Sequence, residues 1–176
     1  ALIADPELPR KAMENRLQGI RPCIACNEGC INRLLFLESV TCVLNAAVGR
    51  EEEFRIQPAE KSKKVLVVGG GPGGMEFARV AALRGHTVIL YEKNSELGGQ
   101  INLASVPSYK YELKSIVPYF EYELGRLGVE IHLGEEVTES MVDDIAPDVV
   151  CIATGSTPIV PDIPGIHGEN VVLATD

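Results

Sequence analysis

The chain has 176 residues, 45% hydrophobic and 23% charged, so it is long enough for a domain with a core and too apolar for wholesale disorder. Its net charge of -9 disfavours nucleic acid as a partner, because an acidic surface repels phosphate backbones. No apolar run approaches the roughly 18 residues that cross a bilayer, so we expect a soluble, cytoplasmic protein without a membrane partner. The chain begins at Ala1 with no Met or leader, and both ends suggest a piece of a longer protein.

The first 60 residues contain little regular structure. Residues 1–20 hold a short helical pattern through Ala12, Met13 and Leu17. Residues 21–60 contain four of the five cysteines. A polar run from Glu51 to Lys64 follows the cysteines and indicates a linker.

From residue 64 onward, apolar runs alternate with helical patterns. Strands are predicted at residues 65–68, 87–91, 129–133 and 149–154, with a short one near Val137, and helices at residues 73–84 and 109–127. The continuous apolar run at 65–68 is typical of a parallel strand buried on both faces. We expect the apolar stripe of the second helix to lie on the sheet. The repeated strand–helix order predicts an α/β domain with a parallel, doubly wound sheet.

The cysteines form a ligand pattern. Cys23, Cys26 and Cys30 share one loop, and Cys42 returns after eleven residues. Four converging thiolates suit a 4Fe-4S cluster, and Gly29 is expected to let the backbone approach the inorganic sulfides. Three alternatives stay open: zinc, whose four-cysteine sites normally use two separate pairs, cysteines without a ligand, and disulfides of a secreted domain.

The remaining reactive residue types suggest no catalytic group. Cys151 lies in an apolar strand, where a free cysteine behaves as a small hydrophobe, so we expect it in the core. His86, His132 and His167 show no ligand or triad spacing and are interpreted as loop or surface residues. No serine or cysteine nucleophile motif is present, and no catalytic residue is assigned.

A glycine fingerprint follows the first predicted strand. In the GxGxxG register, Gly69 permits a tight turn, Gly71 lets the backbone approach a pyrophosphate, and Gly74 lets the helix pack on the strand. Glu92, 23 residues after Gly69, is placed to bind the ribose hydroxyls of adenosine, which favours FAD or NAD over NADP. An ordinary glycine turn and an ordinary surface acid are the alternatives.

Two further short motifs favour a flavin. The turn Leu97–Gln100 follows Glu92 and is placed to reach the flavin side of a long dinucleotide, and Ala153–Gly155 closes a buried strand. Together with the fingerprint they resemble the flavoprotein reductases that have two dinucleotide-binding domains. Taken singly, each motif is equally compatible with a plain turn.

These stretches, together with residues 1–9, 21–30 and 41–45, make the chain similar to the NADH:flavin oxidoreductase group. That group includes 2,4-dienoyl-CoA reductase, enoate reductase and trimethylamine dehydrogenase, and its barrel resembles old yellow enzyme. The resemblance implies that residues 1–20 are the remnant of an FMN-bearing (β/α)8 barrel. It also implies that residues 21–60 are the iron-sulfur segment and linker, and that residues 61–176 are a truncated Rossmann-like FAD domain into which an NAD(P) domain is inserted.

The resemblance also assigns site residues. The cluster ligands are Cys23, Cys26, Cys30 and Cys42, and the contacts to FAD, or to ADP, are Gly69, Gly71, Pro72, Gly73, Gly74, Glu92, Gly99, Gln100 and Val137. Val137 would contact adenine through its backbone. The chain departs from the family at Ala46, where relatives often have proline, which puts the course of that loop in doubt.

The implied function is the electron-transfer portion of an NAD(P)H-dependent ene-reductase. Electrons would pass between FAD and FMN through the 4Fe-4S cluster to reduce an activated C=C bond of an enoate or dienoyl-CoA. The partners would be the FMN barrel and the NAD(P) domain of the same protein. The sequence leaves open whether that protein forms a homo-oligomer. The alternatives are an amine dehydrogenase and a non-catalytic, zinc-stabilised nucleotide-binding module. The three residues between Cys26 and Cys30 look more like the reductase branch. We expect the chain alone to be inactive.

Overall fold

The computed structural model describes residues 1–173. The N-terminal part holds α1 (Leu8–Met13), the 3₁₀ turn η1 (Leu17–Gly19), the π-helical turn η2 (Glu28–Asn32) and α2 (Arg33–Leu35). The rest holds β1 (Lys64–Val68), α3 (Pro72–Leu83), β2 (Thr87–Glu92), α4 (Gln100–Ala104), the 3₁₀ segment η3 (Ser108–Ser115), α5 (Ile116–Arg126), β3 (Glu130–Leu133), α6 (Glu139–Ile145) and β4 (Val149–Ile152). Residues 51–63 connect the two parts without a helix or strand, as predicted for a linker.

The four strands form one parallel sheet in the order β3-β2-β1-β4. This order is one half of a doubly wound sheet, so the predicted fold class is confirmed. β1 is one of the two inner strands, and its Leu66 and Val67 are fully buried, so its prediction as a strand buried on both faces is also confirmed.

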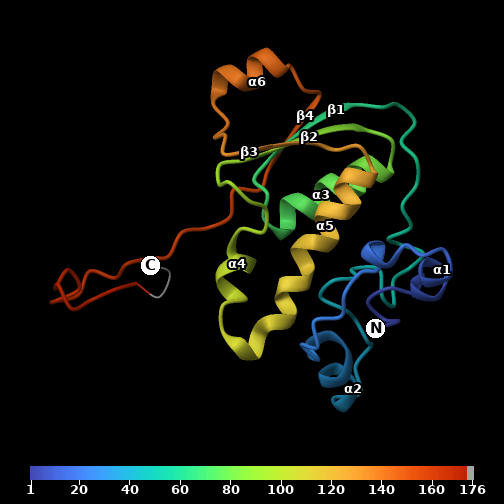
Figure 1. Cartoon of the computed structure of the whole chain (residues 1–176), viewed down its shortest axis with the longest axis horizontal. Helices are drawn as coiled ribbons and strands as arrows, with labels where there is room; N and C mark the ends of the chain where they lie inside the picture. The colour runs from blue at the N-terminus through green and yellow to red at the C-terminus, as the bar shows by residue number, and fades with distance from the viewer. Residues whose placement is uncertain (174–176) are drawn as a thin grey trace.

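Helices α3 and α5 lie side by side against one face of the sheet (Figure 1). α6, which has no buried residue, lies on the opposite side of the sheet. The apolar stripe of α5 supplies Ile116, Phe120 and Leu124 to the same core cluster as the strand residues Val67 and Leu90. This core fixes the loop between β1 and α3, which forms the candidate nucleotide site.

The helix predicted at residues 109–127 is wrong in its first part. Residues 108–115 form the 3₁₀ segment η3, interrupted by the non-helical Lys110, and the α-helix begins only at Ile116. Pro118 explains this start, because proline cannot donate to the carbonyl four residues earlier and its ring clashes with that carbonyl. Pro118 is therefore tolerated in the first turn of α5 but not further along a helix.

Two of the strand predictions need correction, those at residues 149–154 and near Val137. β4 ends at Ile152, and as an edge strand it leaves Val150 and Ile152 exposed, so it is not a buried strand. The short strand near Val137 is wrong, because residues 135–138 are an extended loop that leads into α6. There Thr138 caps the helix by accepting a hydrogen bond from the Met141 amide at 3.3 Å.

A buried ion pair fixes the N-terminal segment. The ammonium of Lys11 donates to Asp5 Oδ2 and to the carbonyl oxygen of Gly19, at 2.7 Å each. The amide of Arg21 donates to the same Asp5 oxygen at 2.7 Å. Burial by itself raises the pKa of Asp5, but the hydrogen bonds from Lys11 and Arg21 outweigh it and the pKa lies below its ordinary value.

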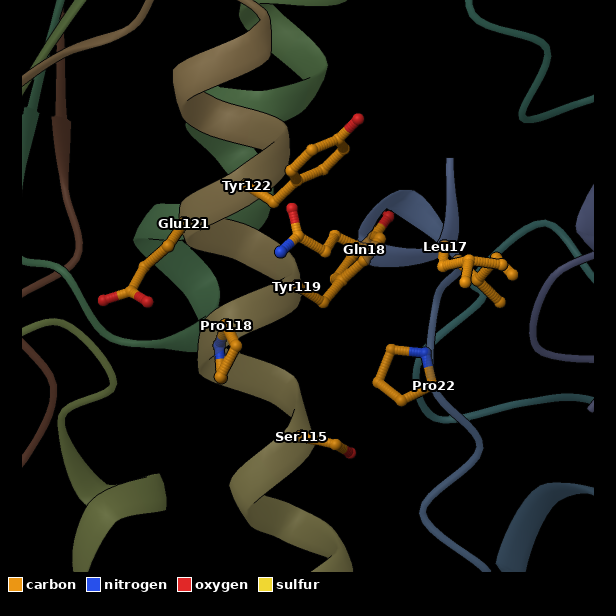
Figure 2. Close-up of a pocket in the computed structure, with 9 residues that line it drawn as sticks. Leu17, Gln18, Pro22, Ser115, Pro118, Tyr119, Glu121 and Tyr122 are labelled. Carbon is orange, nitrogen blue, oxygen red and sulfur yellow. The ribbon is translucent and has the colours of Figure 1, made fainter. Parts of the chain in front are cut away.

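The N-terminal segment also contacts α5 of the sheet domain. Arg21 Nε donates to the hydroxyl of Tyr119 at 3.3 Å, and Gly19 lies against Tyr122. An open cavity remains at this junction, with Leu17 and Pro22 on one side and the side chains of α5 on the other (Figure 2). The two parts of the chain are thus in direct contact next to the first cysteine. Each helix described between residues 1 and 173 is too short or too polar to cross a membrane.

Candidate functional site

Two of the three fingerprint glycines are required by packing. Gly69 has φ +111°, and a Cβ there would overlap the carbonyl oxygen of Ala153 at the end of β4. A Cβ on Gly74 would overlap the carbonyl oxygen of Gly69. The loop therefore turns sharply against β4, and α3 packs directly on the end of β1, which are the two roles that the sequence predicts.

Gly71 differs from Gly69 and Gly74, because a side chain at this position would point into open space. A Cβ on it would meet no atom of the described residues within 4 Å. The helix α3 begins at the next residue, Pro72, and the first amide groups of a helix have no intrahelical acceptor. These amides and the helix dipole make the open space in front of Gly71 a site for an anion such as a pyrophosphate.

Glu92 ends β2 with a buried carboxylate. Its Oε2 accepts a hydrogen bond from the amide of Gly70 at 2.6 Å, and its Oε1 accepts one from the amide of Asn94 at 2.9 Å. Glu92 thus holds the glycine loop in place from inside, a role that the sequence did not suggest. A Cβ on Gly70 would lie 2.5 Å from Leu97 Cδ2 and 3.0 Å from Glu92 Cβ, so Gly70, the second glycine of the run, is also required by packing.

The second glycine turn lies against the first. The amide of Gly98 donates to the carbonyl oxygen of Gly70 at 2.9 Å, and a Cβ on Gly99 would lie 3.2 Å from Gly71 Cα. Gln100 Nε2 donates to the carbonyl and hydroxyl oxygens of Ser156, at 3.0 and 3.1 Å. The structure thus brings Gly99 and Gln100 to the fingerprint loop and to the chain that leaves β4.

The loop that contains Val137 also reaches this edge of the sheet. The amide of Gly134 donates to the carbonyl of Asn94 at 2.8 Å, and the amide of Glu135 donates to that of Glu92 at 3.1 Å. Val137, which is half-buried, follows two residues later. The predicted nucleotide contacts therefore gather at the carboxyl ends of β1 and β2, where ligands bind in open α/β sheets.

The four candidate cluster ligands lie in the N-terminal part. Cys23 and Cys26 are exposed, whereas Cys30 and Cys42 are half-buried. Between residues 1 and 173, no three His, Cys, Asp or Glu side chains are arranged as a metal site. The donor set itself, four free thiols from two neighbouring segments, has the chemistry that a 4Fe-4S cluster requires.

The backbone around these cysteines has an unusual conformation. Ala25 and Asn27, which flank Cys26, have φ +52° and +58°, a left-handed conformation that is uncommon for residues other than glycine. Cys30 lies in the π-helical turn η2, a rare form that occurs frequently at functional sites.

Two apolar side chains anchor the cysteine segment to the sheet domain. Ile24, next to Cys23, and Leu44, two residues after Cys42, both pack against the core cluster of the nucleotide domain. Cys151 was predicted in the core, but it is half-buried and packs against the core cluster from its periphery, because β4 is an edge strand. Partial burial raises the pKa of its thiol. The ring of His132 stacks on Tyr91 with centroids 4.3 Å apart, which gives it a structural role in the sheet.

A family model described as pyridine nucleotide-disulphide oxidoreductase matches residues 63–175. The chain belongs to this family. The match covers the sheet and the glycine loop, and it agrees with the oxidoreductase class that the sequence motifs predict.

Relatives of this pyridine nucleotide-disulphide oxidoreductase chain extend over its cysteine segment. A cinnamate reductase of Clostridium sporogenes is 46% identical over 89% of the chain, and an N,N-dimethylglycine/sarcosine dehydrogenase of Chromohalobacter salexigens is 42% identical over 93%. The structure of a 2-naphthoyl-CoA reductase superposes on 98% of the chain with a TM-score of 0.95 and 40% identity. The chain spans about a quarter of each, 24%, 24% and 26% respectively. The resemblance noted from the sequence is therefore confirmed.

Proposed function

We propose that this chain is the electron-transfer portion of an NAD(P)H-dependent flavin and iron-sulfur oxidoreductase that reduces an activated C=C bond. One observation supports the proposal: Ile24, next to Cys23, and Leu44, two residues after Cys42, pack against the core of the nucleotide domain. One packed unit would thereby hold two electron-carrier sites.

The residues around the glycine loop fit FAD. The open space at Gly71 and the start of α3 would take the pyrophosphate, and Glu92 would face the adenosine ribose. Pro72, Gly73 and Gly74 form the first turn of α3, and Gly99, Gln100 and the Val137 loop border the same edge. ADP alone would satisfy the same contacts.

The cysteine segment would hold a 4Fe-4S cluster through Cys23, Cys26, Cys30 and Cys42. Such a cluster passes single electrons and so connects carriers that exchange two. The residues of the chain set its surroundings: the segment is anchored by Ile24 and Leu44, and Arg21 attaches its start to Tyr119 of α5. FMN and NAD(P)H would be bound by the rest of the parent protein, to which residues 1–20 would connect as the end of a barrel.

An amine dehydrogenase, with electrons flowing in the opposite direction, is the second candidate, because the sarcosine dehydrogenase is nearly as similar as the cinnamate reductase. Substrate tests on the whole protein separate the two. The proposal expects NADH-dependent loss of an enoate such as cinnamate and no amine-dependent reduction of an external acceptor. The reverse result would exclude the ene-reductase assignment.

Metal analysis tests the cluster and excludes a zinc module. Anaerobically purified whole protein should contain about four irons, with acid-labile sulfide, per chain, since four thiolates suit a cubane. Cys42→Ser should lose the intact cluster, whereas Cys151→Ser, the matched control, should keep it. Stoichiometric zinc without iron would show that the cysteine interpretation is wrong.

A further inference from the structure

We propose that Gly29 and Thr41 form the contact that positions Cys42 as the fourth ligand of the cluster, so that Gly29 is a positioning residue for the metal site. The inference rests on the proposed function and deepens it. Three of the cysteines lie within eight residues of one another, whereas Cys42 lies twelve residues beyond Cys30. The fold must therefore bring Cys42 back to the other three.

Two hydrogen bonds join the two segments next to the ligands. The carbonyl oxygen of Gly29 accepts the amide of Thr41 at 2.6 Å and its hydroxyl at 3.3 Å. Gly29 directly precedes Cys30, and Thr41 directly precedes Cys42. The bonds therefore bring together the backbone beside two of the four cysteines.

Glycine is required at position 29 because there is no room for a side chain, and not because of its backbone conformation. It lies inside η2 and has no positive φ, so an alanine would adopt the same backbone angles. Glycine inside a helical turn is normally unfavourable by roughly 0.5–1 kcal/mol relative to alanine. A Cβ on Gly29 would, however, lie 2.7 Å from the carbonyl oxygen of Thr41 and 2.8 Å from its carbonyl carbon and Oγ1. Thr41 lies so close to the Cα of Gly29 that only a hydrogen atom fits between them.

The atoms that a Cβ would meet belong largely to the backbone, which cannot rotate away. To restore ordinary contact at 3.4 Å from 2.7 Å, Thr41 must retreat by about 0.7 Å, and Cys42 is covalently bonded to the carbonyl that moves. Metal–ligand distances vary by only about 0.2 Å. A methyl group at Gly29 should therefore remove Cys42 from coordination without touching the other three thiols.

The structure adds a role for Gly29 beyond the approach of the backbone to inorganic sulfide that the sequence predicts. The missing side chain leaves room for Thr41. Gly29 is buried, in contrast to the exposed Cys26 earlier in the loop, which agrees with a role inside the segment.

The test compares Gly29→Ala with Cys42→Ala in the anaerobically purified whole protein, by iron and sulfide content, EPR and FAD content. Gly29→Ala should reproduce the Cys42→Ala variant: loss of about one iron or more from the four that wild type holds, with the same EPR spectrum and undiminished FAD. Gly125→Ala is the matched control, since a Cβ there meets no described atom within 4 Å, and it should keep the wild-type iron content.

Two outcomes would overturn the inference. Wild-type iron content and spectrum in Gly29→Ala would show that Thr41 moves without displacing Cys42. Loss of FAD together with the cluster would show that Gly29 supports the fold as a whole and not the fourth ligand. If the wild-type protein itself holds no iron-sulfur cluster, the proposed function is wrong. The wild-type iron content thus distinguishes a failure of the proposed function from a failure of the inference about Gly29.

Discussion

The substitution Gly71→Ala separates the glycine that serves the cofactor from those that serve the fold. At this position φ is -72° and ψ is 179°, which alanine adopts freely, and an added Cβ meets no described atom within 4 Å. The methyl group would instead enter the space in front of α3, where the pyrophosphate is proposed to lie. The methyl group should therefore leave the folded protein intact but weaken the binding of FAD.

Two small and opposed effects determine the stability of this variant. Alanine is a poorer N-cap than glycine by up to about 1 kcal/mol, and it reduces the freedom of the unfolded chain, which stabilises by about 0.4–1 kcal/mol. The net change in the free energy of unfolding should be close to zero. By contrast, losing one charge-assisted hydrogen bond to phosphate costs about 1.5–3 kcal/mol, which is roughly a 10- to 100-fold loss of affinity.

The assay is titration of deflavinated whole protein with FAD, followed by calorimetry or flavin fluorescence, alongside chemical denaturation without the cofactor. Gly125→Ala is again the control, because it adds the same methyl group in α5, away from the loop. FAD affinity within twofold of wild type in Gly71→Ala would refute the placement of the pyrophosphate. A loss of stability well above 1 kcal/mol would refute the claim that this space is free in the folded protein.

Three further changes test neighbouring parts of the structure. Gly74→Ala should destabilise the protein by about 1–3 kcal/mol in chemical denaturation, because its Cβ overlaps the Gly69 carbonyl; unchanged stability would contradict the close packing. Glu92→Arg should weaken the binding of FAD and remove the preference for it over 2'-phosphorylated nucleotides in competition titrations, since Glu92 holds Gly70 and is proposed to bind the adenosine ribose. Asp5→Asn leaves Lys11 buried without its counter-charge and should cost about 3–5 kcal/mol near neutral pH. Because the pKa of Asp5 is lowered in the fold, its contribution is complete above its unfolded pKa of about 3.9 and is lost as the pH falls through the lower folded value. The stability gap between wild type and Asp5→Asn should therefore close in strong acid, and a gap that does not depend on pH would contradict the ion pair.

The two inner strands were predictable because each has a strong local signal. The runs at residues 65–68 and 88–91 are apolar and are bounded by glycine or polar residues, and β1 and β2 follow them closely. α4 and α6, with five and seven residues, are too short to show a helical period and were missed. The start of α5 was misplaced because the apolar spacing continues through η3, while Pro118 sets the boundary.

Residue types and their spacing along the chain were enough to predict the fold class and to select the glycine fingerprint, Glu92 and the four cysteines as candidates. The sequence does not tell which glycines are needed for packing and which leaves a space for a ligand. That depends on close contacts in the folded protein, such as those of Gly69 with Ala153 and of Gly70 with Leu97. The same holds for Gly29 and Thr41, and for Asp5, whose partners lie up to 16 residues away. Close contact and burial are properties of neighbours in space, and no local pattern of residues encodes them.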